Sequence, residues 1–182
     1  MFASKNLTAG QLNALVKKLG GETVVLAILG GVRRFTLEAC EDQPYNGSIF
    51  FRTRTGLYVK SSLDRYVGLD GHTTRGTQPK GRVIERNSSE TELFGKPGTD
   101  KHAAALTNAV DLGQIETMIK AQWNGQQGDL LTNCYANIFP VVGKNGALHV
   151  VNVYRDGGKW FVRCEPFQAD YVWHASIQVF SN

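Results

Sequence analysis

A cysteine and a histidine in the last third of the sequence have the residue types of a nucleophilic pair. Cys134 follows a loop rich in Gly and Asn, and His149 lies in a strand-like run. A thiol attacks as a nucleophile when an imidazole about 3 Å away takes its proton. Pairing of their two strands places them about six residues apart along the sheet, roughly 20 Å. A cysteine hydrolase that uses Cys134 and His149 is therefore an alternative, and a buried structural cysteine is the favoured interpretation.

A second candidate is a mixed polar and aromatic face of the same predicted sheet. In the predicted register Asn137, Asn152 and Arg163 lie abreast on neighbouring strands, and Tyr135 and Tyr154 flank them. Aromatic rings can stack on a base while amides bind its edge, as in RNA-binding sheets. The alternatives are an ordinary solvated sheet face and a face that packs against the helix predicted over 103–123.

A third candidate is a basic segment in the first half of the chain. Residues 50–86 contain eight basic and three acidic side chains, a balance of +5, whereas the whole chain carries +4 and the remainder therefore −1. A local excess of this kind attracts nucleic acid or an acidic protein surface, although it also suits a solvated loop. The basic residues are Arg52, Arg54, Lys60, Arg65, Arg75, Lys80, Arg82 and Arg86.

Other chemistry has no signal in the sequence. The three cysteines are widely spaced and odd in number, so they predict neither a disulfide framework nor a metal site. P-loop, dinucleotide-binding and G-x-S-x-G patterns are missing, and we expect no cofactor. The longest aliphatic run is Val24–Leu29, far below the ~20 residues of a membrane span, and the first residues do not resemble a secretion leader. We expect a cytoplasmic protein without membrane association.

The elements that must position these residues belong to an α+β fold in one domain, 1–182. Capping signals and Gly pairs predict a helical hairpin over 1–31. Two strand-like runs on either side of a turn near Thr55 and Gly56 predict a β-hairpin over 48–67, and a Gly, Thr and Ser-rich composition predicts a basic irregular excursion over 68–101. A helical region follows over 102–124, where Asp111 and Gln114 have the spacing of a cap.

The last third, 132–182, predicts an antiparallel meander. Its first two loops are expected to contain four residues, 143–146, and two residues, Gly157 and Gly158. This register puts Ile138, Val151 and Cys164 abreast on an apolar face. The opposite face then holds the mixed polar and aromatic residues.

Three segments resemble a loose group of uncharacterised bacterial proteins from candidate-phylum and metagenomic sequences. They are LNALVKKLGG, CYANIFPVVGKNGALHVVNVYRDGGKWFV and the ending WHASIQVFSN. The resemblance implies a bacterial or phage-like origin and no particular activity. From all of these features we expect a small non-enzymatic binding or accessory protein for nucleic acid or an acidic protein surface. A protein-binding inhibitor or assembly protein is a further alternative.

Overall fold

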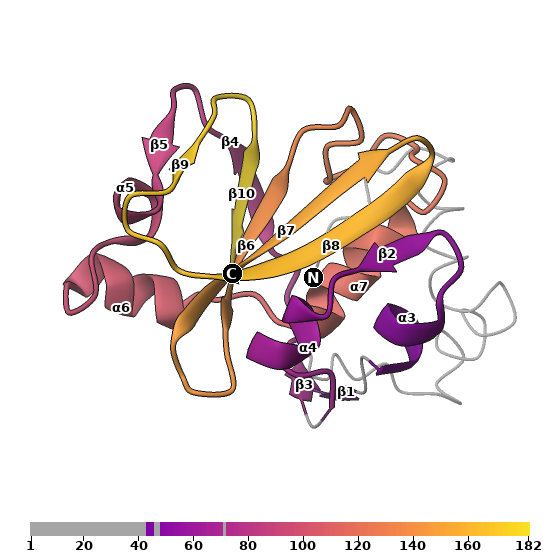
Figure 1. Cartoon of the computed structure of the whole chain (residues 1–182), viewed down its shortest axis with the longest axis horizontal. Coiled ribbons are helices and arrows are strands. Elements are labelled where there is room, and N and C mark those ends of the chain that lie inside the picture. The colour runs from indigo at the N-terminus through magenta and orange to yellow at the C-terminus, as the bar shows by residue number, and fades with distance from the viewer. Residues whose placement is uncertain (1–42, 46–47, 71) are drawn as a thin grey trace, which may run out of the picture. The chain divides into compact units, whose positions relative to one another are not determined.

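The computed structural model describes residues 43–45, 48–70 and 72–182 (Figure 1). The helical hairpin predicted over 1–31 lies outside the described residues, and the single-domain prediction stays a prediction. The described part combines helices with a mixed six-stranded sheet, which confirms the α+β class. None of its helices has both the length and the apolar character needed to cross a membrane.

The six-stranded sheet has a central antiparallel meander with shorter strands added on both sides. β6, β7 and β8 pair antiparallel, whereas β2 joins β8 and β10 joins β6 in parallel, and β4 pairs antiparallel with β10. The antiparallel meander predicted over 132–182 is correct for β6, β7 and β8 only, because the last strand-like run forms β9, which pairs with β5, and β10, which joins β6 in parallel. The parallel addition of β2 was not predicted. In spatial order the strands are β2 (Leu57–Val59), β8 (Lys159–Pro166), β7 (Leu148–Asp156), β6 (Asn137–Val142), β10 (Gln178–Ser181) and β4 (Lys80–Val83).

Short helices flank this sheet at its two ends. Figure 1 shows α3 and α4 near β2, whereas α5 and α6 lie at the β10–β4 end with a two-stranded sheet, β5–β9. A further two-stranded sheet pairs β1 with β3. The bounds are α3 (Ser48–Thr53), α4 (Ser62–Tyr66), α5 (Glu90–Phe94), α6 (Asp100–Thr107), α7 (Leu112–Ala121), β1 (Gln43–Tyr45), β3 (His72–Thr74), β5 (Ser88–Ser89) and β9 (Val172–Trp173).

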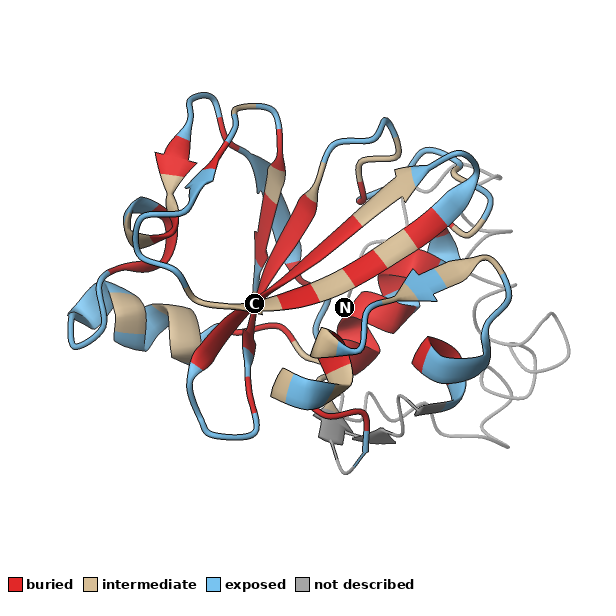
Figure 2. Ribbon diagram, in the orientation of Figure 1, coloured by how far each residue is buried: buried red, intermediate tan, exposed pale blue. Residues whose placement is uncertain are grey.

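One face of the sheet forms the main core with α7. Ile115 and Ile119 of α7 are fully buried in the same cluster as Phe139 and Val151. The predicted cap at the start of this helix is confirmed, because Asp111 Oδ1 accepts from the Gln114 backbone N–H at 2.9 Å. Figure 2 shows buried residues concentrated along β6, β7 and α7 and alternating with half-buried ones along β8.

The elements that the structure describes cover the opposite face of the sheet only in part. A second cluster packs Ile138 and Val150 against Phe94 of α5 and Trp173 of β9. This cluster covers the face near β6 and β10. The same face over β8 and β2 carries half-buried and exposed side chains.

The predicted β-hairpin over 48–67 is wrong. The segment forms α3, then β2, then α4. Phe50 and Phe51 are consecutive and both buried, at 5% and 4% exposure, which a two-sided strand with one solvated face does not allow. Leu57–Val59 is a strand, but its partner is β8, about a hundred residues along the chain.

The irregular excursion and the continuous helix also need correction. Residues 68–101 contain β3, β4, β5 and α5, and the helical region divides into α6 and α7. Ser89 and Glu92 form a capping box that begins α5, a sequence signal that composition obscured. Between α6 and α7 the Val110 N–H donates to the Pro140 carbonyl at 2.8 Å, so this link is attached to the sheet.

The predicted register is correct for one hairpin and wrong by one residue for the other. Asp156 pairs with Lys159 across Gly157 and Gly158, and both glycines have the positive φ (+52° and +79°) that a two-residue primed turn requires. The first loop instead contains five residues, 143–147, because Val142 pairs with Leu148. Each β6 side chain therefore lies on the face opposite to its predicted one.

Candidate functional site

Three aromatic rings lie in a row across neighbouring strands on the open face of the sheet. Tyr154 on β7, Phe161 on β8 and Tyr58 on β2 are brought together by the register of the two strand pairs. Their ring centroids are 5.0 Å apart between Tyr154 and Phe161 and 5.1 Å apart between Phe161 and Tyr58, with planes within 6° and 16° of parallel. We call these three residues the aromatic strip.

Neighbouring rings of the strip are stacked with a sideways offset. Face-to-face contact between carbon atoms requires about 3.5 Å, so rings whose centroids are 5 Å apart are displaced sideways and leave part of each ring uncovered. Tyr58 is 50% exposed, and its two neighbours are half-buried. The Lys159 ammonium lies 5.2 Å from the Tyr58 ring centroid and donates to its hydroxyl at 3.1 Å. A partly apolar surface with a cation at one end results.

One row further along the strands, two polar side chains have no hydrogen-bond partner in the described part of the chain. Asn152 and Arg163 face each other across β7 and β8, as predicted. Asn152 is only 4% exposed, its buried Oδ1 accepts no hydrogen bond from a described residue, and the buried Nε of Arg163 donates none to one. Neither side chain forms a hydrogen bond or ion pair with any described residue. Buried polar groups are normally satisfied, so these two side chains are available to hydrogen-bond a water molecule or a ligand that enters from this face.

These two side chains line a cavity of about 190 Å³ that we call the Glu90 cavity. Glu90 is 2% exposed and accepts from the Gln168 backbone N–H at 2.6 Å and from the Trp173 indole N–H at 3.1 Å. Burial raises the pKa of Glu90, and its two hydrogen bonds partly oppose this change. Its lining residues include Glu90, Val150, Asn152, Arg163, Glu165 and Trp173.

The predicted sheet-face site is only partly correct. Asn152, Tyr154 and Arg163 do lie together, but Asn137 lies on the core face because of the register shift. Asn137 is fully buried and has three hydrogen bonds, two of them with the backbone of Leu131 and one with the Val153 carbonyl. Tyr135 lies outside the sheet and is 47% exposed.

Sequence reasoning missed Tyr58 and Glu90. Tyr58 joins the strip through a parallel pairing between segments that are about a hundred residues apart, and no local pattern indicates such a pairing. Glu90 lies at the start of α5, next to a capping box, where a glutamate ordinarily serves the helix terminus. Trp173, which contacts Glu90 in the fold, was the available signal, since a buried indole N–H needs a hydrogen-bond acceptor.

The structure does not bring Cys134 and His149 together. The Cys134 thiol donates to Asp156 Oδ1 at 3.5 Å, at the end of β7, whereas His149 lies near the start of that strand. Seven residues of strand correspond to roughly 23 Å. The hydrogen bond to Asp156 is the main cause that raises the pKa of Cys134. The His149 ring contacts Tyr66 and bonds to the Ala147 carbonyl through Nδ1.

The eight predicted basic residues do not form one surface. Lys60 and Arg65 lie by β2 and α4, whereas Lys80 and Arg82 lie on β4, the opposite edge strand. Five strand spacings separate these two edges, about 24 Å. Charges on the exposed β4 also have an ordinary role, because they protect an edge strand from pairing with other chains.

The other four basic residues have partners within the described part of the chain. Arg52 forms ion pairs with Asp64 and Asp70. Arg75 donates to the Thr107 and Ala109 carbonyls, which ties the segment after β3 to the end of α6. The other two are Arg86, paired with Glu92 at 3.0 Å, and Arg54, which lies over the Trp123 ring at 4.6 Å.

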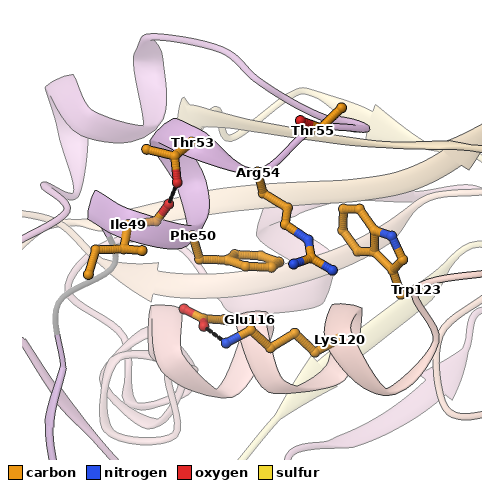
Figure 3. Close-up of a pocket in the computed structure, with 8 residues that line it drawn as sticks. All are labelled: Ile49, Phe50, Thr53, Arg54, Thr55, Glu116, Lys120 and Trp123. Carbon is orange, nitrogen blue, oxygen red and sulfur yellow. Dashed lines mark hydrogen bonds and ion pairs between the residues drawn. The ribbon is translucent and has the colours of Figure 1, made fainter.

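A larger hollow lies between α3 and α7 (Figure 3). The Arg54 guanidinium extends between the Phe50 and Trp123 rings, and the Lys120 ammonium forms an ion pair with Glu116 beside the Phe50 ring. Both cations are thus engaged by aromatic rings or a carboxylate. This hollow has fewer unsatisfied groups for a ligand than the Glu90 cavity does.

The described residues contain no group of three or more His, Cys, Asp or Glu side chains that could hold a metal ion. No protein-family model matches the chain, and neither the curated proteins nor the solved structures include a significant match to it.

Proposed function

We propose that the chain is a non-enzymatic binding protein that holds single-stranded nucleic acid on the aromatic strip. The observation that supports this proposal most strongly is the continuous row of Tyr154, Phe161 and Tyr58 across three strands, on a part of the sheet face that no described element covers. Every nucleobase has a π-face, so stacking on aromatic side chains gives affinity without requiring a particular sequence.

Charge near the strip suits a phosphate backbone. Lys159 lies at the Tyr58 end, Arg163 has no ion pair with a described residue, and Lys60 directly follows β2. These cations lie within one or two residues of the rings along the strands. An acidic protein surface would use the same cations, but it would make little use of a row of parallel rings.

The experiment is the binding of a fluorescently labelled twelve-nucleotide oligo(dT), followed by anisotropy at low salt. Tyr58→Ala should weaken binding by about 5- to 100-fold, the range that one base–aromatic stacking contact provides. Tyr135→Ala is the matched control, because Tyr135 has a similar exposure but no ring contact with the strip. Its affinity should equal that of the unmodified protein.

Salt dependence tests the backbone contacts separately. Three phosphate contacts on a single strand correspond to a slope of about −2 in a plot of log affinity against log salt concentration. Lys159→Ala should reduce the steepness of this slope. Absence of oligonucleotide binding at low salt, or equal affinities for Tyr58→Ala and Tyr135→Ala, contradicts the proposal. Binding of a polyglutamate peptide in its place would favour an acidic protein partner.

A further inference from the structure

The Glu90 cavity has a chemistry distinct from that of the aromatic strip beside it. Its 190 Å³ is room for about six water molecules, less than the volume of a pocket for a drug-sized ligand. A planar nucleobase fits this volume, whereas a whole nucleotide does not. The sugar and phosphate of a bound nucleotide would remain outside, on the side of the strip.

Acceptors dominate the interior of the cavity. Asn152 Oδ1 is buried without a partner among the described residues, and each Glu90 oxygen accepts one hydrogen bond and keeps capacity for another. Glu165 adds a second carboxylate, and it forms no hydrogen bond or ion pair with a described residue. Arg163 is the cationic donor. Two carboxylates against one guanidinium disfavour a phosphate, so the group that enters is one that offers N–H donors.

We infer that the Glu90 cavity binds one guanine base of the nucleic acid held on the aromatic strip. Guanine has two adjacent donors, N1–H and the N2 amino group, beside the acceptor O6. Carboxylate and amide oxygens accept from the donors, and an Arg guanidinium is a common partner of guanine O6. Adenine, cytosine and thymine each have one donor group on this edge and would leave a cavity acceptor unpaired.

The walls of the cavity suit an aromatic base. Trp173 is 8% exposed and Tyr171 is 41% exposed, and their rings are 4.9 Å apart at 67°. Val150 forms an apolar part of the lining. Asn152 and Tyr154 are two residues apart on β7, about 7 Å, so a base in the cavity and a base on the strip can belong to neighbouring nucleotides.

This inference rests on the proposed function, and its experiment separates the two. Oligo(dT) is compared with the same oligonucleotide that carries one central dG. The dG should raise affinity about tenfold, a change expected for one well-matched base contact. Asn152→Leu should abolish this preference and leave the affinity for oligo(dT) unchanged. Tyr58→Ala should weaken binding to both.

The outcomes are distinct. Binding of oligo(dT) that depends on Tyr58 without a preference for dG overturns the inference and leaves the proposed function intact. If no oligonucleotide binds, GMP is titrated against AMP by calorimetry. Binding of GMP that Asn152→Leu removes then supports the cavity alone, and absence of GMP binding overturns it. Binding of free arginine in place of GMP would also overturn it, because it would assign the cavity to a guanidinium.

Discussion

The two buried asparagines of the sheet allow a direct test of the assignment of its faces. Asn137 and Asn152 have the same side chain, lie on adjacent strands and are 0% and 4% exposed. The Asn137 side chain has three hydrogen bonds to backbone groups, and Asn152 has none with a described residue. Replacement of each by Leu removes the amide and keeps a branched side chain of similar shape.

Opposite changes in stability are expected. Asn152→Leu removes a buried unsatisfied polar group, and its extra bulk can extend into the adjoining Glu90 cavity. The free energy of unfolding should rise by about 1–3 kcal/mol, the penalty of such a group. Asn137→Leu leaves the Leu131 N–H, the Leu131 carbonyl and the Val153 carbonyl without their partner. Its free energy of unfolding should fall by roughly 2–5 kcal/mol.

The assay is urea denaturation followed by tryptophan fluorescence, with thermal unfolding as a second measurement. The two variants should differ by about 3 kcal/mol or more, which corresponds to at least about 6 °C in Tm for a chain of this size. Asn152→Leu should also lose the preference for dG while it gains stability. If Asn152→Leu destabilises the protein as much as Asn137→Leu does, Asn152 is a structural polar group and the reasoning for the cavity is refuted.

Three further predictions concern the turn, the thiol and the buried carboxylate. Replacement of both Gly157 and Gly158 by Val should lower the free energy of unfolding in urea by several kcal/mol, because both positions have positive φ, whereas Gly157→Asn should be tolerated. Equal stability of the two variants would contradict the primed turn. Asp156 raises the pKa of Cys134, so alkylation of Cys134 at pH 8 should be slower than that of a free thiol, and Asp156→Asn should make it faster than in the unmodified protein. Rapid modification near pH 6 would contradict this prediction. Burial raises the pKa of Glu90, so the folded protein binds more protons than the unfolded chain above about pH 4, and its free energy of unfolding should decrease as the pH rises from there. Glu90→Gln should remove this decrease, and a pH profile that the substitution leaves unchanged would refute the prediction.

Local signals predicted the parts of the fold that depend on neighbouring residues. The cap at Asp111 and the turn at Gly157 and Gly158 are recognisable because a few adjacent residues satisfy or allow a particular backbone geometry. The length of the loop 143–147 was not recognisable. Loops of four and five residues have similar compositions, yet they place opposite faces of β6 against the core.

Contacts between distant segments determined the structure of residues 48–67, which local patterns did not predict. Residues 48–67 contain consecutive aromatic and aliphatic residues that suit a strand, and tertiary packing placed Phe50 and Phe51 in a helix against the core instead. Tyr58 then reached Phe161 through a parallel pair that joins two distant segments. The part of the candidate site that lies on one hairpin was therefore predictable, namely Asn152, Arg163 and Tyr154.

Stability and binding make opposite demands at the open face of the sheet. A face selected only for stability would place an apolar residue at position 152, because its row neighbour Ile138 is fully buried and Val150 on the same strand is 1% exposed. An amide there destabilises the free protein, and the proposed ligand would satisfy it. The same holds for Glu90, whose charged form is disfavoured by burial. Two such features in one cavity, next to three aligned rings, are more economically explained by a ligand than by two unrelated defects of packing.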